Sequence, residues 1–398
     1  MIPDLARIVR AGDGVLCGQA CAEPQTLTEA LVAQRAAFSG ATLFLGINYS
    51  GIVRPEHADH LRLASYCGAG HNRALADAGV LEIHPDPYSR LGALIRARRI
   101  RADVVLVQVS PPDGRGEMSL GLAAEYLIPA LESCRAVIAE VNDQVPWTHG
   151  ERTLRREDCA LVVETSRPPA PAPRAAAGQL ERAIARHAAP YVPERATLEF
   201  GLGSLPEALC AALAERRGLA VHSGTIGDGV ADLMRGGAVE RAACGLLMGS
   251  RKLFDFVHRN ASVALRSSEF THDPRVLGAL ERFVAVNAAV EVDLGGQVNG
   301  EVARGSYLGA VGGALDFVRA ANQSPGGVAL TVVPAARIVA RVSGPVATPR
   351  SEAGVIVTEH GAADLRGLTL RERARRVLEI APPGARESLA RSAAEPRR

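Results

Sequence analysis

Arg167-Pro-Pro-Ala-Pro-Ala-Pro-Arg174 lies near the middle of this 398-residue chain and divides it into two halves. Four prolines within six residues cannot continue a helix or a central strand, because proline lacks an N–H donor and has a fixed φ. We therefore interpret residues 168–178 as a linker. The chain is long enough for two to three domains, and we predict one domain at 1–167 and another at 179–398.

Short β-rich runs alternate with helical patterns in the half that precedes this linker. We expect a helix at Leu120–Cys134, between two of the strands. The expected strands are Thr42–Gly46, Asp103–Ser110, Ala136–Asn142 and Ala160–Thr165. This alternation is typical of α/β folds with parallel or mixed sheets.

The same alternation begins again after the linker, so the second half is also predicted to be α/β. Its longest β-rich run is Phe283–Val298, and its last residues are polar and expected to be frayed. The other expected strands are Thr197–Phe200, Leu219–His222 and Val355–Thr358. The expected helices are Gln179–His187, one that begins after Pro206 and runs to about Arg217, Gly229–Arg235, Lys252–Arg259, Val311–Ala321 and an amphipathic helix at Leu370–Ile380.

Charge and composition exclude several classes of function. With 45 basic and 43 acidic residues the net charge is +2, so we expect neither a nucleic acid nor a membrane as partner. Lys252 is the single lysine, so there is no phosphate-loop lysine after a glycine run. Seven scattered cysteines without a Cys-x-x-Cys pair, and no recognisable targeting segment, indicate reduced thiols in a cytoplasmic protein.

Glu291 is the most unusual residue of the long β-rich run. It lies in Val286-Asn-Ala-Ala-Val-Glu-Val-Asp-Leu-Gly-Gly-Gln297, where strict alternation places Glu291 and Asp293 on one face of a mostly apolar strand. Burying a charge without a partner is costly, and perturbed carboxylates gather at functional sites. The pattern is also compatible with an exposed edge strand that has one solvated face.

Two glycine-rich turns precede expected helices and would let a ligand approach the backbone closely. They are Gly201-Leu-Gly203-Ser-Leu-Pro206 and Gly309-Ala-Val-Gly312-Gly313. Neither has the Gly-x-Gly-x-x-Gly spacing of a dinucleotide fold, and both could be ordinary tight turns. Glu56-His57-Ala-Asp59-His60 lacks the His-Glu-x-x-His order, so we interpret it as a solvated surface and predict no metal site.

Several further stretches, taken together in this order, resemble the class I CoA-transferases of the acetyl-CoA hydrolase/transferase and 4-hydroxybutyrate CoA-transferase type. In the first half they are Gln108–Asp113, Ser119–Gly121, Ala139–Asn142 and Pro146–Gly150. In the second half they are Gly201–Pro206, Ile226–Leu233, Met248–Asp255, Asn287–Gln297, Gly312–Phe317 and Val357–Gly367.

The resemblance implies two related open α/β domains with the active site in the cleft between them. It also implies that Glu291 is a covalent nucleophile that exchanges coenzyme A between small carboxylic acids through anhydride and glutamyl-CoA intermediates. Coenzyme A and acyl-CoA would be substrates rather than tightly bound cofactors, and a homodimer is a possible assembly. The residues implied to contact coenzyme A are Arg266, Ser267, Ser268, Glu269, Phe270, Gly312, Gly313, Ile338 and Gly361.

Three other functions remain open at this level. An acyl-CoA hydrolase would use the same fold and the same glutamate, with water as the acceptor. A non-catalytic acyl-CoA-binding protein would keep the cleft but show no turnover. A dinucleotide oxidoreductase would require binding of a nicotinamide cofactor to one of the glycine-rich turns.

Overall fold

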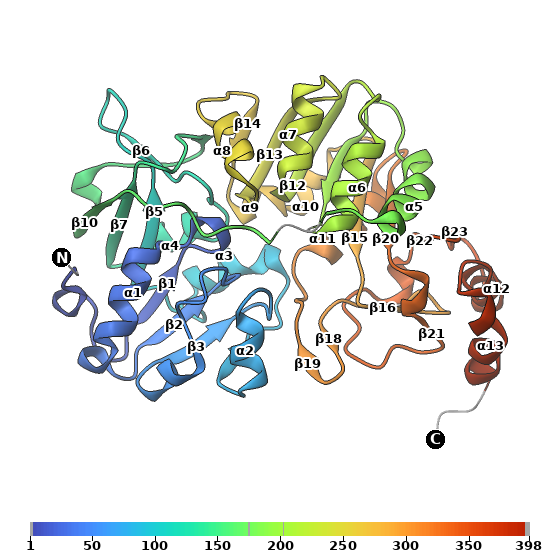
Figure 1. Ribbon diagram of the computed structural model, residues 1–398, viewed down its shortest axis with the longest axis horizontal. Coiled ribbons are helices and arrows are strands. Elements are labelled where there is room, and N and C mark those ends of the chain that lie inside the picture. Colours follow the sequence, from blue (N-terminus) through green and yellow to red (C-terminus); the bar gives the residue numbers. More distant parts are fainter. Residues whose placement is uncertain (1–2, 174–175, 202, 395–398) are drawn as a thin grey trace.

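The computed structural model describes residues 3–173, 176–201 and 203–394. Outside these ranges lie the first two residues of the predicted first domain, residues 174 and 175 of the predicted linker, Leu202 of the first glycine-rich turn and the last four residues. Figure 1 shows most elements up to β10 on one side of the molecule and most elements from α5 onward on the other. The predicted α/β class is confirmed, because each side is built around a largely parallel sheet with helices against it.

The first sheet has seven parallel strands in the order β10-β7-β5-β1-β2-β3-β4. Its central strands are buried along their whole length, as expected for a parallel sheet covered on both faces. The strands are β1 (Gly14–Cys17), β2 (Thr42–Leu45), β3 (Arg62–Ser65), β4 (Leu81–Ile83), β5 (Val104–Val109), β7 (Ala136–Asn142) and β10 (Leu161–Thr165).

The second sheet has nine strands in the order β23-β22-β20-β15-β11-β12-β13-β14-β8. All neighbours are parallel except β22 and β23, which form a tight hairpin. The strand β8 comes from the predicted first domain, so the two halves share this sheet. The strands are β8 (His149–Gly150), β11 (Thr197–Phe200), β12 (Leu219–Ile226), β13 (Val239–Leu247), β14 (Val263–Leu265), β15 (Phe283–Ala288), β20 (Val328–Val332), β22 (Val355–Thr358) and β23 (Gly361–Asp364).

Helices cover both sheets, and α5, α6 and α7 lie together along one side of the second sheet (Figure 1). In the first half the helices are α1 (Gln25–Gln34), α2 (Asn72–Asp77), α3 (Leu91–Arg96) and α4 (Leu127–Ser133). In the second half they are α5 (Gln179–Ala188), α6 (Ser204–Ala212), α7 (Asp228–Arg235), α8 (Arg251–Val257), α9 (Ser268–Thr271), α10 (Pro274–Gly278), α11 (Ala314–Gln323), α12 (Leu370–Glu379) and α13 (Arg386–Ala394).

Short strands complete the fold beside the two main sheets. The three-stranded sheet β17-β16-β21 packs its own small apolar core against α12. These strands are β6 (Met118–Ser119) with β9 (Thr153–Leu154), β16 (Glu291–Asp293) with β17 (Val298–Asn299) and β21 (Ile338–Val339), and β18 (Val302–Ala303) with β19 (Ser306–Tyr307).

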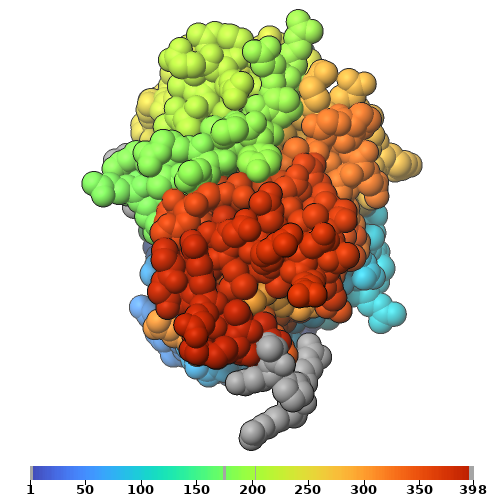
Figure 2. All heavy atoms as spheres, turned by 90° about the vertical axis from the view of Figure 1, so that its right-hand side faces the viewer, coloured from blue at the N-terminus to red at the C-terminus, as the bar shows by residue number. Residues whose placement is uncertain are grey.

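Three predicted elements need correction. The helix expected over Leu120–Cys134 begins only at Leu127, because the preceding backbone bonds to the second half, with Ala124 N–H donating to the Gly245 carbonyl at 2.9 Å. The long run at Phe283–Val298 is divided between two sheets, β15 and β16. The polar end is helical rather than frayed up to residue 394, as α13, and Figure 2 shows the C-terminal part of the chain, in red, across the middle and lower part of one side of the molecule.

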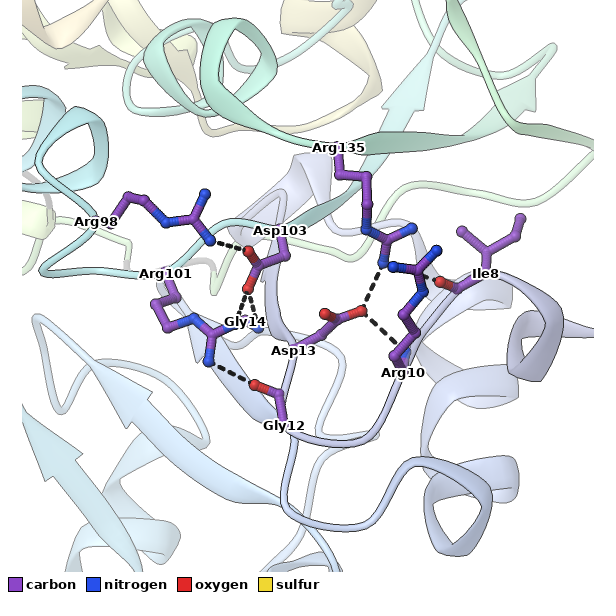
Figure 3. A network of polar contacts seen from close by, with 9 residues as sticks. All are labelled: Ile8, Arg10, Gly12, Asp13, Gly14, Arg98, Arg101, Asp103 and Arg135. Carbon is purple, nitrogen blue, oxygen red and sulfur yellow. Dashed lines mark hydrogen bonds and ion pairs between the residues drawn. The ribbon is translucent and has the colours of Figure 1, made fainter.

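Ion pairs fix the amino end of the first sheet (Figure 3). Asp103, which precedes β5, bonds Arg98 at 2.5 Å and Arg101 at 2.6 Å, and it also accepts the N–H of Gly14 at 2.7 Å. Asp13, which precedes β1, bonds Arg135 at 2.7 Å. These contacts lie at the amino ends of the strands, so the carboxyl ends are left to form a site.

The described residues were compared with the requirements of a membrane span, a metal site and a disulfide. Its helices are all too short or too polar to cross a bilayer. The same residues contain no group of three or more His, Cys, Asp or Glu side chains placed to hold a metal ion. All seven cysteines are unpaired.

Candidate active site

The two halves enclose a cavity of about 510 Å³ at the carboxyl ends of their strands. Gln19 enters it just after β1, Phe200 ends β11, and Thr225 lies near the end of β12. In parallel α/β sheets this edge is where ligands bind. The hydroxyl, amide and carboxyl side chains that line the cavity are Gln19, Tyr66, Tyr88, Glu125, Glu199, Thr225 and Asn287.

Glu125 anchors the first half of this cavity in a buried hydrogen-bond network. Its Oε1 accepts a bond from Gln19 Nε2 at 2.6 Å, and its Oε2 accepts one from the Tyr88 hydroxyl at 2.5 Å. The Tyr66 hydroxyl donates to Gln19 Oε1 at 2.9 Å. Burial raises the pKa of Glu125 to about 7, although the bonds from Tyr88 and Gln19 act in the opposite direction.

Glu199 is the carboxylate that the second half contributes. Its side chain comes from the middle of β11, and Asn287 at the end of the adjacent β15 donates to Glu199 Oε2 at 2.9 Å. The residue is only 3% exposed. Burial raises the pKa of Glu199 to about 8, and the bond from Asn287 only partly opposes this effect. None of the residues that line the cavity is Lys or Arg, so neither carboxyl group has a cationic partner there.

His272 lies against this cavity but is unsuited to acid–base chemistry. Its ring packs between Tyr88 and Phe317, with ring centroids 5.1 and 4.5 Å away. Burial lowers the pKa of His272 to about 3, so the imidazole stays neutral. A Cβ on Gly313 would lie 2.2 Å from its Nε2, so only glycine fits at that position beside this ring.

A second cavity of about 640 Å³ adjoins the first. Gly201, Gly203 and Pro206 of the first glycine-rich turn line it, together with the linker residues Ala172 and Pro173. Both cavities share the lining residues Ile47, Ala69, Phe200, Gly201 and Thr225. Carboxyl groups line both cavities, with Glu125 and Glu199 in the first and Glu207 and Asp228 in the second.

Glu291, the predicted nucleophile, lies just outside this space. Ala289 and Val290 line the first cavity, but Glu291 is not among the lining residues of either cavity. Its Oε1 accepts four hydrogen bonds, from Asn299 Nδ2, from the N–H and hydroxyl of Ser343, and from the N–H of Gly344. Burial would raise the pKa of Glu291, but these bonds outweigh it and hold the pKa below its ordinary value.

Asp293 shares the face of Glu291, as the alternation predicted, but it has a local structural role. Its Oδ1 accepts the N–H groups of Gly295 and Gln297, each at 2.9 Å, and its Oδ2 accepts the Gln297 side chain at 2.7 Å. These bonds hold the turn between β16 and β17. Asp293 thus holds its own turn, whereas Glu291 joins β16 to Ser343 and Gly344, which lie far away in the sequence.

The predicted coenzyme A loop, Arg266 to Phe270, forms the start of the short helix α9 and lies behind the first cavity. The N–H groups of Ser267 and Ser268 already donate to Glu151 Oε1 and to the Glu125 carbonyl, at 2.8 and 3.2 Å. They are therefore not free to stabilise an oxyanion. The hydroxyl of Ser268 is buried without a hydrogen-bond partner.

The three remaining side chains of this loop are held by neighbours. The guanidinium of Arg266 stacks on the ring of Phe270, 3.9 Å from its centroid. Glu269 is paired with Arg96 of α3. All five residues of the loop lie outside the lining of both cavities, so the structure places them in a supporting layer.

The last four predicted contacts divide into two pairs. Gly312 and Gly313 line the first cavity. Ile338 is a core residue of β21, 5% exposed and packed with Val292 and its neighbours. Gly361 opens β23, and with Thr358 as its cross-strand partner it closes the two-residue hairpin loop after β22. Neither Ile338 nor Gly361 lines a cavity.

The sequence analysis did not identify the two buried glutamates of the cavity. Glu199 interrupts the apolar strand Thr197–Phe200, which is the same signal that drew attention to Glu291. Glu125 was hidden inside the expected helix at Leu120–Cys134. The partners Gln19, Tyr66 and Tyr88 carry no local signal, because only the sheet topology brings them together.

Comparison with known proteins agrees with this architecture. Residues 2–167 match the acetyl-CoA hydrolase/transferase N-terminal domain, and residues 249–393 match the corresponding C-terminal domain. The chain is 33% identical to the 4-hydroxybutyrate coenzyme A transferase of Clostridium kluyveri, over 94% of this chain and 92% of that protein.

Solved structures give the same result. RipA from Yersinia pestis superposes with a TM-score of 0.93 at 28% identity, covering 98% of this chain and 95% of that chain. The 4-hydroxybutyrate CoA-transferase from Porphyromonas gingivalis superposes with a TM-score of 0.82, also at 28% identity and with the same coverage. The chain therefore belongs to the acetyl-CoA hydrolase/transferase family of CoA-transferases and acyl-CoA hydrolases.

Proposed function

We propose that the protein transfers coenzyme A from an acyl-CoA thioester to a second small carboxylic acid. The observation that supports this proposal best is a cavity between the two halves into which buried carboxylates project without a cationic partner. A carboxylate is the nucleophile this exchange requires, because its acyl anhydride and thioester are both reactive enough to pass the group on without ATP. The names of the relatives, which include a 4-hydroxybutyrate coenzyme A transferase, support the same reaction class.

The residues that line the two cavities suit an acyl-CoA thioester. Apolar side chains such as Leu246, Val311 and Phe317 line the first cavity and suit a short acyl chain. The glycine-rich turn that begins at Gly201 lines the second cavity and lets an extended ligand lie close to the backbone. Binding of the distant part of coenzyme A can then be used to orient the reacting carbonyl.

Hydrolysis is the second candidate, because water can replace the acceptor acid in the same cavity. The two functions differ only in what attacks the acyl-enzyme, so exclusion of water favours transfer. A non-catalytic acyl-CoA-binding protein would hold acyl-CoA in the same cavity without turnover.

The test is an exchange assay with short acyl-CoA thioesters, each with and without acetate, butyrate, 4-hydroxybutyrate or succinate. We expect the CoA thioester of the acceptor acid to form, and liquid chromatography of the thioesters measures its rate of formation. Release of free coenzyme A at the same rate with and without acceptor would instead identify a hydrolase. Tight binding of acyl-CoA without any turnover would contradict the proposal.

A further inference from the structure

We infer that the first cavity accepts only acyl groups that carry no charge, so that the acids exchanged are short monocarboxylic acids rather than dicarboxylic acids. This inference rests on the proposed transfer of coenzyme A and names the class of acid that takes part. A monocarboxylic acid loses its charge when it becomes a thioester, whereas a dicarboxylic acid keeps one negative charge on its acyl group. The groups that line the cavity determine which of these two acyl groups can be bound.

The acidic side chains of this cavity have no basic counterpart among the described residues that line it. Glu125 comes from the first half and is 2% exposed, and Glu199 comes from the second half and is 3% exposed. Like charges disfavour each other, and the effect is large where water is excluded. A carboxylate on the acyl group would therefore meet neutral or negative side chains and no cation.

The arginine that follows this cavity most closely along the chain is engaged elsewhere. Arg266 precedes Ser267, whose backbone forms an isolated bridge with that of Glu125. Its guanidinium, however, stacks on the ring of Phe270 and lies 3.7 Å from the carboxylate of Glu151. Arg266 does not line the cavity, so it is not placed to neutralise a carboxylate bound there.

The side-chain donors of the first half are used within their own network. Both amide hydrogens of Gln19 are engaged, with the Tyr88 hydroxyl at 3.0 Å and with Glu125 at 2.6 Å. The Tyr88 hydroxyl donates to Glu125 at 2.5 Å, and the Tyr66 hydroxyl donates to Gln19 Oε1 at 2.9 Å. Turning any of these donors toward a substrate carboxylate would leave a buried acceptor unpaired, which is costly.

The second half adds side-chain donors that are neutral. Asn287 gives one of its two amide hydrogens to Glu199 at 2.9 Å, and Thr225 contributes a hydroxyl. Burial raises the pKa of Glu199 to about 8, which shows that this part of the cavity already disfavours a negative charge. A dicarboxylic acyl group would have to bury a second charge here without an ion pair.

Apolar side chains form much of the remaining lining. Leu246 of β13 and Phe317 of α11 are 1% and 2% exposed, and Val311 of the second glycine-rich turn is half-buried beside them in the lining. An uncharged acyl chain gains free energy when its apolar surface leaves water for such a lining. A carboxylate in the same place would lose its hydration without compensation.

Binding of three S-alkyl derivatives of coenzyme A tests the inference. S-(3-carboxypropyl)-CoA, S-(3-carbamoylpropyl)-CoA and S-(4-methylpentyl)-CoA have nearly the same size and end in a carboxylate, an uncharged amide and an isopropyl group. They have no thioester carbonyl, so they bind without reacting. In calorimetry at pH 7 with the wild-type protein, we expect the carboxylate derivative to bind about 100-fold or more weakly than the isopropyl derivative and about 10-fold or more weakly than the amide.

A variant that adds a cation tests whether the lining causes this order. Val311→Lys places an ammonium group on a residue that lines the cavity. We expect the affinity for the carboxylate derivative to rise about 10-fold or more relative to the isopropyl derivative. Val311→Met, an uncharged side chain of similar length, is the matched control and should keep the wild-type ratio. All three ligands share the same coenzyme A part, so an effect of the new charge on its phosphates cancels in the ratio.

The outcomes separate the inference from the proposed function. Equal affinities of the wild-type protein for the carboxylate and amide derivatives would overturn the inference, as would an unchanged ratio in a Val311→Lys variant that still binds the isopropyl derivative. The expected order of affinities without transfer from any donor would overturn the proposed function and leave a site for uncharged acyl groups. A wild-type protein that binds none of the three ligands would overturn both.

Discussion

Asn287 Nδ2 lies 2.9 Å from Glu199 Oε2 and links the ends of two adjacent strands inside the inter-domain cavity. Because a hydrogen bond to a carboxylate stabilises its charged form, Asn287 lowers a pKa that burial raises to about 8. Loss of Asn287 should therefore raise the pKa of Glu199 further.

Asn287→Ala is expected to move the pH profile of transfer to higher pH. A hydrogen bond to a charged group contributes about 1.5–3 kcal/mol, which corresponds to about one to two pH units. At pH 7 we expect kcat/KM to fall about 10- to 100-fold, and the rate should recover toward the wild-type value as the pH rises. Asn322→Ala, on an exposed residue of α11, is the control, and an equal loss at every pH would contradict the interpretation.

Glu199→Gln should make the protein more stable at high pH. Burial raises the pKa of Glu199 from 4.5 to about 8, so between these values the folded state retains a proton that the unfolded state releases. The free energy of unfolding of the wild type therefore decreases as the pH rises from about 4.5 to about 8. Thermal unfolding from pH 5 to pH 8.5 should show the variant gaining stability over the wild type as the pH rises, and a constant difference would be evidence against a buried carboxylate.

Tyr88→Phe should destabilise the protein more at pH 8 than at pH 6. The substitution removes the hydroxyl that donates to Glu125 at 2.5 Å. Burial raises the pKa of Glu125 to about 7, so this carboxyl group is mostly ionised at pH 8. The lost hydrogen bond therefore costs more stability at pH 8, because it stabilises the ionised carboxylate. We expect a loss of about 1–3 kcal/mol in the free energy of unfolding by urea at pH 8. Tyr126→Phe is the matched control, because its hydroxyl donates to the uncharged carbonyl of Cys17 and its loss should not depend on pH in this way.

Glu291→Ala should loosen a surface loop without abolishing transfer. The Glu291 carboxylate accepts the N–H groups of Ser343 and Gly344, at 2.6 and 3.3 Å. Without this acceptor, hydrogen exchange of these two amides should accelerate, and we expect transfer to fall by no more than about 10-fold. A loss of 10³-fold or more with the fold retained would restore Glu291 as the nucleophile that the sequence predicted.

Asp103→Ala should reduce stability but not transfer. Its carboxylate joins Arg98, Arg101 and the N–H of Gly14 at the amino end of the first sheet, away from the cavity (Figure 3). We expect a loss of about 1–3 kcal/mol in the free energy of unfolding at pH 7, because a buried donor loses its acceptor. Burial raises the pKa of Asp103, but the bonds from Gly14 and the arginines outweigh it and hold the pKa below 3.8. The stability that the ionised carboxylate provides is therefore lost only when the pH falls below 3.8.

The sequence by itself determined the α/β class and most of the strands that were named. These depend on local hydrophobic patterns, which act within a few residues of each other. The strands at Ala136–Asn142, Thr197–Phe200 and Val355–Thr358 have the predicted bounds. The order of matching motifs along the chain was also enough to identify the family.

Only the tertiary structure decided which carboxylates meet a substrate cavity. Glu199 and Glu291 carry the same local signal, an acidic residue within an apolar strand, but β11 ends at the inter-domain cavity and β16 turns into a separate small sheet. Glu125 and Gln19 are 106 residues apart and meet only because β1 and the turn before α4 reach the same edge. Burial, and with it the pKa of each carboxyl group, depends on such long-range contacts, which is why local sequence could not show which acidic residues lie at the cavity.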